Sequence, residues 1–405
     1  MRIRFGRFTT VLAACALGLP LFAQSDDLKG ELFNPVQTGV NSLNIAPDAR
    51  GGGMGDIGAA TDPDVNSQYW NPAKYAFAYS RAGASLSYTP WLRKLVSDIN
   101  LAYLAGYWKV GQNDMQAISA SMRYFSLGEI NITNENNDVT DAINPYEMAV
   151  DLGYSRKLSD SYSMGVVFRY IYSNLAYSSE EDITAGNAFA ADIAGYLTRY
   201  PIIGRSECQW SFGYNISNVG SKVSYDGGAT SAFLPTNLKV GTTLLFPLDD
   251  YNRMSVSLDL NKLLVPTRPL AGQYVNEDGS YNEAEYQDAL ERYYATSSIS
   301  GIFKSFSDAP GGFEEELKEI NISIGAEYSY NDQFFVRGGY FHESQNKGNR
   351  KYFTMGAGFA LNVFRLDAAY VISTAQSSPL DQTLRFTLSF DMDGLRDMVG
   401  YGRRR

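Results

Sequence analysis

The sequence is poor in the side chains on which many enzymes and metal sites depend. Its 405 residues include one histidine, His342, and two cysteines, Cys15 and Cys208. Metal clusters and histidine-dependent nucleophiles therefore have little to draw on. Because Cys15 falls within a predicted export signal, Cys208 would stand alone in the mature chain, which excludes an intramolecular disulfide. We expect no catalytic residue, no cofactor and no metal ion, and we interpret His342 as a solvated residue at a strand end.

Long apolar runs are also missing after residue 23, and the mean hydropathy of the chain is only −0.24. A membrane-spanning helix needs roughly 18 or more apolar residues in succession, so the mature chain is predicted to contain none. In the first 23 residues, three arginines precede the apolar run Phe8–Ala23, a pattern that predicts a secretory signal peptide over residues 1–23. The alternative is a lipoprotein signal with Cys15 as the lipidated residue, but cleavage there would leave apolar Ala16–Ala23 at the mature N-terminus.

The charge balance argues against another class of partner. The chain carries 34 basic and 44 acidic residues, a net charge of −10, and removal of the three arginines of the signal would make it −13. Proteins that bind nucleic acid present lysine and arginine to the phosphates. Nucleic acid is therefore not expected as a partner.

What the chain has in abundance is a repeated strand pattern, together with 29 tyrosines and 37 glycines. From Ala82 to Asp391, stretches of about ten residues alternate apolar residues with small or polar ones, as the strands of membrane barrels do. In Ile320–Tyr330 the apolar face is Ile320, Ile322, Ile324, Ala326, Tyr328 and Tyr330, and the other face is Asn321, Ser323, Gly325, Glu327 and Ser329. A period of two with one apolar face indicates a strand between lipid and water.

Fourteen strands can be counted, and the connections between them are alternately short and long. The strands begin near Ala82, Asn100, Met115, Tyr146, Tyr162, Ala188, Glu207, Thr236, Arg253, Glu319, Gln333, Lys351, Phe364 and Thr383. Single-chain bacterial barrels have an even number of antiparallel strands, short periplasmic turns and longer outer loops. The predicted fold class is all-β, a fourteen-stranded antiparallel transmembrane β-barrel over residues 82–391, with a C-terminal tail at 392–405.

The polar face of these strands carries charges of both signs. They are Arg123, Asp151, Arg169, Asp192, Lys239, Asp259, Glu327, Arg337, Arg365, Asp367 and Arg385. Buried charges persist only when they are paired. We therefore interpret them as structural ion pairs inside the lumen, in preference to an ion-selectivity filter.

The segment before the barrel, residues 24–81, does not alternate and is rich in Gly, Asn, Asp and Pro. Irregular backbone is tolerated at membrane depth only inside a protein or beside a water-filled cavity, so we predict an N-terminal hatch segment in the lumen. Its Gly53–Gly58 stretch matches the dinucleotide-binding glycine pattern, but no apolar strand precedes it and no helix clearly follows. We interpret these glycines as letting the backbone pass close to the barrel wall.

Two stretches carry a family resemblance: Asn41–Asp56 with the following Tyr69–Ala73, which reads Tyr-Trp-Asn-Pro-Ala, and Leu384–Gly394 at the end of the barrel. They resemble the PorV family of the type IX secretion system. The wider long-chain fatty-acid transporter (FadL-like) family also has an Asn-Pro-Ala within a hatch inside a fourteen-stranded barrel. The residues of the candidate hatch motif are Asp48, Arg50, Gly51, Gly52, Gly53, Gly55, Asp56, Trp70, Asn71 and Pro72.

The resemblance implies an integral outer-membrane protein of Bacteroidota, surrounded by membrane lipid. It would bind secreted cargo proteins through their C-terminal domains and shuttle them from the type IX translocon to a surface sortase-like attachment protein. The alternative implied by the wider family is an outer-membrane transporter of hydrophobic small molecules.

The longest connection, Leu263–Lys318, contains ten acidic and four basic residues, so that lipopolysaccharide phosphates are poor direct ligands for it. If Asn282–Thr296 is helical, one side of the helix carries an apolar stripe. Its members are Tyr286, Leu290, Tyr293 and Tyr294. The stripe either packs on the barrel rim or binds a partner.

Overall fold

The computed structural model describes residues 33–93, 96, 98–111, 113–133, 139–175, 184–228, 230–275, 280–361, 363–374 and 380–392. The predicted signal peptide, Cys15 and the predicted tail beyond Met392 lie outside these residues.

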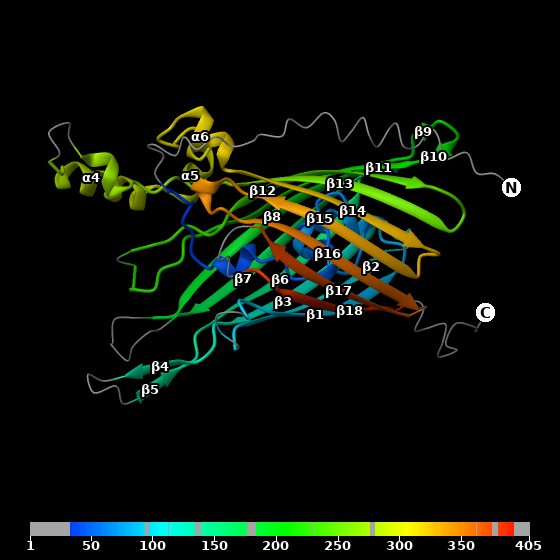
Figure 1. Cartoon of the computed structure of the whole chain (residues 1–405), viewed down its shortest axis with the longest axis horizontal. Helices are drawn as coiled ribbons and strands as arrows, with labels where there is room; N and C mark the ends of the chain where they lie inside the picture. Colours follow the sequence, from blue (N-terminus) through cyan, green and yellow to red (C-terminus); the bar gives the residue numbers. More distant parts are fainter. Residues whose placement is uncertain are drawn as a thin grey trace. The chain divides into compact units, whose positions relative to one another are not determined.

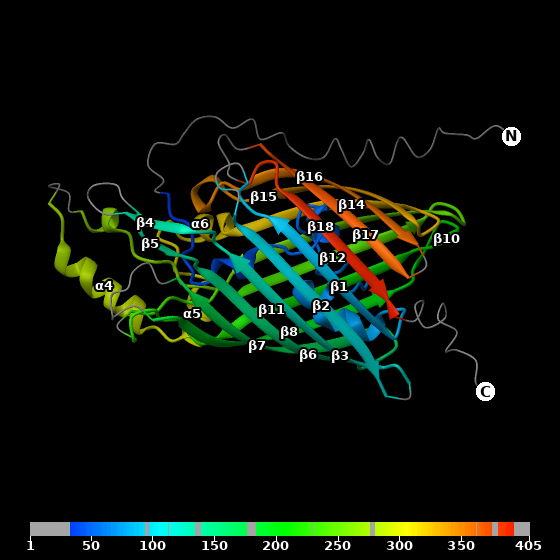
Figure 2. The same ribbon diagram turned by 90° about the horizontal axis from the view of Figure 1, so that it is seen from below.

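Fourteen antiparallel strands close into a barrel in the order β1-β18-β17-β16-β15-β14-β13-β12-β11-β8-β7-β6-β3-β2 (Figures 1 and 2). They are β1 Ala82–Pro90, β2 Asn100–Val110, β3 Gln116–Ser126, β6 Tyr146–Lys157, β7 Tyr162–Asn174, β8 Gly186–Arg199, β11 Gln209–Gly220, β12 Asn237–Pro247, β13 Asn252–Leu263, β14 Ile320–Tyr330, β15 Phe334–His342, β16 Lys351–Leu361, β17 Phe364–Ser373 and β18 Leu384–Asp391. Pairing of β1 with β18, with Gly83 opposite Asp391, closes the ring. The predicted barrel of fourteen antiparallel strands is confirmed.

The alternation of the sequence is visible in the exposure of the side chains. On β3, Ile118 and Met122 are exposed on the outer face, whereas Arg123 is buried on the inner face. On β14, Ile324 is exposed and Glu327 is buried. Large apolar side chains therefore point outward and polar ones inward, the reverse of the distribution in a water-soluble protein.

Connection lengths alternate around the ring as expected, but two of the connections contain hairpins that the sequence analysis missed. One hairpin pairs β4 (Ile130–Thr133) with β5 (Val139–Ile143) on the long-loop side. The other pairs β9 (Ile202–Ile203) with β10 (Ser206–Glu207) at the opposite end of the barrel (Figure 1). Neither hairpin belongs to the barrel ring, so neither shows the alternation that lipid imposes.

The longest connection folds into short helices. They are η3 (Ala271–Tyr274), α4 (Glu283–Ala295), α5 (Ser298–Lys304) and α6 (Phe313–Lys318), and a further turn, η4 (Gln345–Lys347), follows β15. The helix expected over Asn282–Thr296 is present as α4, and the Asn282 side chain accepts a hydrogen bond from the Glu285 N–H at its N-terminus. Among the described residues, no helix combines the length and the apolar character needed to cross a bilayer.

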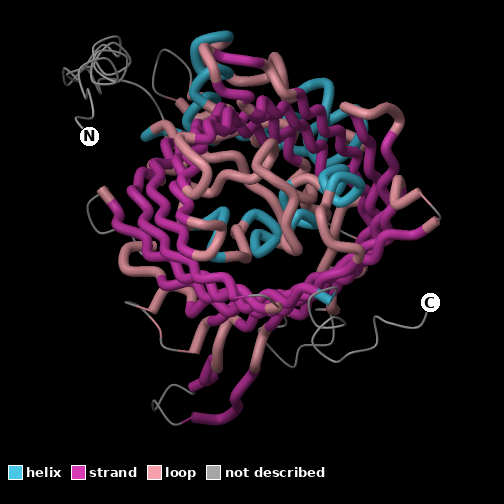
Figure 3. The backbone as a smooth tube through the Cα atoms, turned by 90° about the vertical axis from the view of Figure 1, so that its right-hand side faces the viewer, coloured by secondary structure: helices cyan, strands magenta, loops and turns pink. Residues whose placement is uncertain are grey.

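The residues before β1 form four short helical turns, η1 (Asn41–Asn44), α2 (Ala49–Gly52), α3 (Ser67–Trp70) and η2 (Pro72–Phe77). Turn η2 contacts β2, β3, β6, β7 and β8, while α2 contacts β16, β17 and β18. Figure 3, which views the ring end on, shows short helices and loops within the circle of strands. We call residues 34–80 the inner segment; its action as a hatch stays a prediction.

Glycines on the wall make room for the inner segment. A Cβ atom added at Gly339 of β15 would lie 2.1 Å from the carbonyl carbon of Met54 and 2.3 Å from the nitrogen of Gly55. The neighbouring Gly338 faces outward, where an added Cβ would meet only the Thr354 carbonyl oxygen, at 3.9 Å. The wall and the backbone of the inner segment are therefore in direct contact.

This contact yields a matched pair of variants. Gly339→Ala should force the inner segment away from the wall and destabilise the folded barrel by about 1–3 kcal/mol, the usual penalty of overpacking. Gly338→Ala should be nearly neutral. Urea unfolding in vesicles measures the stability, and limited proteolysis reports release of the inner segment. Equal behaviour of the two variants would contradict the contact.

Candidate functional site

The hatch-motif residues Asp48 and Trp70 fix the fold of the inner segment. The Asp48 carboxylate caps α2 by accepting a hydrogen bond from the Gly51 N–H at 2.9 Å, and it accepts another from the Trp70 indole at 2.6 Å. All three residues are buried. One buried carboxylate therefore starts a helix and joins two parts of the segment that lie 22 residues apart.

Asn71 and Pro72 start the second half of the segment. The Asn71 side-chain oxygen Oδ1 accepts from the Ala73 N–H at 3.1 Å, and Pro72 occupies the first position of η2, where its missing N–H is not needed. The Asn71 amide also donates to the carbonyl oxygens of Ala59 and of Gly195, the latter on β8, at 2.8 and 3.0 Å. The Asn-Pro pair thus anchors the segment to the wall.

The glycines of the motif lie where side chains would collide. A Cβ atom at Gly52 would come within 2.1 Å of the Arg385 guanidinium. Gly55 has a φ of +81°, and its Cβ would lie 2.9 Å from the backbone of Tyr340. The two other glycines, Gly51 and Gly53, are crowded by Trp70 and by Gly356. This crowding supports the interpretation that glycine lets the backbone approach the wall.

Arg50 joins the inner segment to a large group of charges on the wall. Its guanidinium pairs with Asp64 at 2.8 Å and with Glu327 of β14 at 3.0 Å. The group is completed by Arg337, Arg365 and Asp367. Three arginines and three carboxylates balance, which is the condition for keeping charges buried. The inner segment contributes one charge of each sign.

A second group lies on the strands β6, β7 and β8. Arg169 pairs with Asp151 at 2.6 Å and with Asp192 at 3.1 Å. Asp151 and Arg169 stand opposite each other in the strand register. This group is the kind of wall-to-wall pairing that the sequence analysis expected.

The remaining lumen charges are met mainly by the inner segment. Arg123 donates to the carbonyl oxygens of Ser42 and Ile45 at the end of η1, and Arg385 donates to the Asp56 carboxylate. The Asp259 carboxylate accepts from the N–H groups of Gly58 and Ala59, both at 2.9 Å. The Lys239 ammonium lies 4.4 Å from the centre of the Trp70 ring.

Sequence reasoning missed at least two charges of the inner segment, Asp64, which pairs with Arg50, and Lys74. Lys74 is fully buried, and its ammonium donates to the Gly58 carbonyl at 2.9 Å and to the Thr61 hydroxyl at 3.0 Å. Its place directly after Asn71-Pro72-Ala73 offered no alternation or charge pattern that could have marked it. The inward-facing charges of the wall are therefore paired both with groups of the inner segment and with side chains on neighbouring strands.

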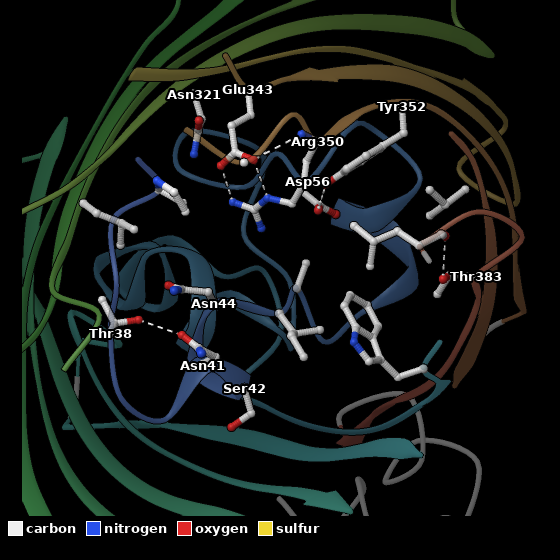
Figure 4. A pocket seen from close by; sticks show the side chains of 18 of the residues that line it. Thr38, Asn41, Ser42, Asn44, Asp56, Asn321, Glu343, Arg350, Tyr352 and Thr383 are labelled. Carbon is white, nitrogen blue, oxygen red and sulfur yellow. Dashed lines mark hydrogen bonds and ion pairs between the residues drawn. The ribbon is translucent and has the colours of Figure 1, made fainter. Parts of the chain in front are cut away.

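A cavity of about 700 Å³ opens at the long-loop end of the barrel (Figure 4). We call it the outer bowl. The amide side chains of Asn41, Asn44 and Asn321 line it, together with the Arg350 guanidinium, which pairs with Glu343 at 2.7 Å. Its apolar lining includes Trp91, Leu92, Phe125, Leu127, Leu263, Val371 and Leu380. These residues come from strand ends, connections and the inner segment, far apart in the sequence, so no sequence pattern could have gathered them.

Two further cavities lie between the inner segment and the wall below the bowl. A cavity of about 30 Å³, bordered by Tyr69, Arg123 and Asp151, has room for about one water molecule. At the short-turn end, a cavity of about 260 Å³ is lined by Arg50 and Asp64 among others. The inner segment borders all three spaces.

The tyrosine stripe of α4 packs against neighbouring loop residues and stays half-exposed. The Tyr286 ring lies 5.6 Å from Tyr274, and the Tyr293 ring lies 5.4 Å from Phe233 in the β11–β12 connection. The Lys222 ammonium donates to the Tyr294 carbonyl at 2.7 Å. Burial raises the pKa of Tyr293 to about 12. The stripe therefore ties two outer loops together.

The closed ring, its apolar outer face and its charged interior define an integral β-barrel protein of the outer membrane. Residues 29–271 match the model of the family described as Type IX secretion system protein PorV. The chain belongs to the PorV family and is an outer-membrane component of the type IX secretion system.

The chain is similar to several solved structures at low sequence identity. The toluene transporter TbuX of Ralstonia pickettii is 15% identical, with 85% of this chain and 96% of that chain covered and a TM-score of 0.41. A FadL homologue of Pseudomonas aeruginosa is 12% identical, with 88% and 99% covered and a TM-score of 0.44. The toluene transporter TodX of Pseudomonas putida is 10% identical, with 89% and 99% covered and a TM-score of 0.47. No curated protein matches the chain.

The charge group around Arg169 provides a test of the interior. Arg169→Met would leave two buried carboxylates without their cation, which should destabilise the barrel by about 3–5 kcal/mol. Arg199→Met, at an exposed position on β8, should change the stability by less than about 0.5 kcal/mol. Urea unfolding of both variants in vesicles measures the difference, and an Arg169 variant as stable as the Arg199 variant would be inconsistent with the pairing.

The long connection should respond to pH through Asp308, which lies between α5 and α6. Burial raises the pKa of this carboxyl to about 6, and the Thr267 N–H donates to it at 3.0 Å. The folded loop therefore binds the proton more tightly than the unfolded loop. Its stabilising contribution is complete below the ordinary aspartate pKa of about 3.9 and is lost as the pH rises through about 6.

Asp308→Asn should accordingly stabilise the loop at pH 8, by about 1 kcal/mol because the carboxyl is partly exposed to water, and by about half as much at pH 5, which lies inside the window between the two pKa values. Asp288→Asn, at an exposed position on α4, is the control. Hydrogen exchange of α5 at the two pH values measures the effect, and a benefit of the same size at both pH values would be incompatible with the assignment.

Proposed function

We propose that this protein binds secreted cargo by the cargo's C-terminal domain and shuttles it from the type IX translocon to a surface sortase-like attachment protein. In this proposal residues 1–23 are removed as a signal peptide and residues 24–81 act as a hatch. The supporting observation is that the inner segment occupies the middle of the barrel: below the outer bowl, the cavities between this segment and the wall measure about 30 Å³ and, at the short-turn end, about 260 Å³, and charged groups border both. A barrel filled in this way suits a platform, with recognition on its outer end.

Cargo would dock at the outer bowl and the adjoining long connection. The bowl is lined by amide groups, an arginine-carboxylate pair and apolar side chains. This combination suits a polypeptide, which presents both backbone polar groups and apolar side chains. Helix α4 lies at the same end of the barrel (Figure 1), has no buried residue, and turns its charged side chains to water. The acidic balance of this loop favours a basic patch on the cargo.

The alternative function is transport of a hydrophobic small molecule. The observation that favours it is the apolar lining of the outer bowl, which includes Trp91, Leu92 and Phe125. A transported molecule would then have to cross the charge groups around Arg50 and Arg385, where desolvated charges offer an apolar solute no compensating contact. The charge groups therefore weigh against transport.

Removal of residues 271–311 tests the docking role. The deletion takes away α4 and α5 but leaves α6, which the Lys262–Glu316 pair holds to β13 at 2.9 Å. Cells with this variant should fail to release or attach cargo although the barrel assembles, as judged by heat-modifiable migration on gels. Removal of the β9–β10 hairpin, residues 202–207, at the other end should leave secretion intact. Normal secretion by the 271–311 deletion would refute docking at this loop.

Affinity purification from outer membranes separates the two functions. Recovery of proteins that carry secretion C-terminal domains is expected for the shuttle. Recovery of bound fatty acid or another apolar solute, without such proteins, would support the transporter instead.

A further inference from the structure

Helix α5 turns its large apolar side chains away from the protein. Ile299 and Phe303 are exposed, Phe303 to 73%, and Phe306 just after the helix is exposed as well. The opposite side of the helix carries the small residues Gly301 and Ser305, both buried. A Cβ atom at Gly301 would lie 3.0 Å from Pro266 and 3.1 Å from Phe233, so close packing holds the helix in this orientation.

Helix α6 has the same inverted polarity, with a charge as its buried residue. Glu316 is buried and pairs with Lys262 of β13. Phe313 and Leu317, one turn apart on another side of the helix, are exposed to 75% and 51%. A six-residue helix that buries a glutamate and exposes a phenylalanine is oriented as if its surroundings were apolar.

Helix α4, in the same connection, has the opposite polarity. Its tyrosine stripe faces neighbouring loop residues, while Glu285, Asp288 and Glu291 are exposed. This is the distribution expected of a helix in water. The inverted polarity is therefore a local property of α5 and α6, and the connection as a whole does not share it.

The inverted helices continue the apolar surface of the barrel. Helix α5 contacts β11 and α6 contacts β14, and Leu317 precedes by a few residues the outward-facing Ile322 and Ile324. Figure 1 shows both helices at the end of the barrel where β12, β13 and β14 meet the long connections. The small or charged inner side and the apolar outer side of the helices repeat the arrangement of the strands below them.

We propose that α5 and α6 lie on the membrane, with a rim patch of Ile299, Phe303, Phe306, Phe313 and Leu317 in contact with the lipid of the outer leaflet. The exposed Lys304 and Glu314 would stand at the level of the lipid headgroups. Contact with lipid removes the patch from water, which otherwise disfavours so many exposed apolar side chains in one place. The rim patch thereby fixes the base of the connection, and α4 stays in water.

Fluorescence quenching by lipid tests this placement in the purified full-length protein refolded into phosphatidylcholine vesicles. A background with both Cys15→Ala and Cys208→Ala removes the native thiols, and single cysteines at Phe303 or Phe313 carry an environment-sensitive nitrobenzoxadiazole label. Gln287→Cys on α4 is the water-exposed control, and Phe168→Cys on the outer face of β7 is the lipid-exposed control. A fraction of the lipid carries a spin label high on its acyl chain.

We expect the labels at Phe303 and Phe313 to be quenched several-fold more strongly than the label at Gln287, and to approach the label at Phe168. Quenching equal to that at Gln287 would overturn the proposal. If the same positions were then shielded from thiol reagents in native outer membranes, a protein partner would be the occupant instead. Because vesicles contain no cargo, this result is independent of the docking function.

Discussion

The structure depends on pairing between charges on the barrel wall and groups of the inner segment. Glu327 on β14 meets Arg50, Asp259 meets two backbone N–H groups, and Arg385 meets Asp56. Because the inner segment shields these wall charges from water, each of them needs a partner on that segment, and loss of one partner should cost several kcal/mol. In the folded protein, segment and barrel therefore supply each other's buried polar groups with partners.

Lipid outside the barrel explains why the interior has this character. Strands that give one face to lipid place most of their charges and amides on the other face. Close packing then requires small residues wherever the inner segment touches the wall, as at Gly339 and Gly325, both of which lie against Met54. The alternation of the strands, the internal charges and the wall glycines thus have a single physical cause.

This cause also explains which features the sequence could predict. The strand starts expected near Met115, Glu207 and Thr236 lie within two residues of those observed, because a period of two with lipid on one side leaves a strong pattern. Outside the bilayer the pattern is lost, and the hairpins β4–β5 and β9–β10 were missed. The inward direction of the charges followed from the alternation. The partners of these charges could not be predicted from the alternation, because Arg50 and Glu327 lie 277 residues apart and meet only in the folded barrel.

The same reasoning separates the outer connections into two environments. Where a helix buries Glu316 and exposes Phe313, the free energy of the exposed side chain is lowest in an apolar medium; where it exposes Glu285 and Asp288, water is favoured. A connection with one part on lipid and the other in water has its base fixed and its outer helix free to meet a partner. In the proposed shuttle function, a fixed base would keep the docking loop at a constant height above the membrane.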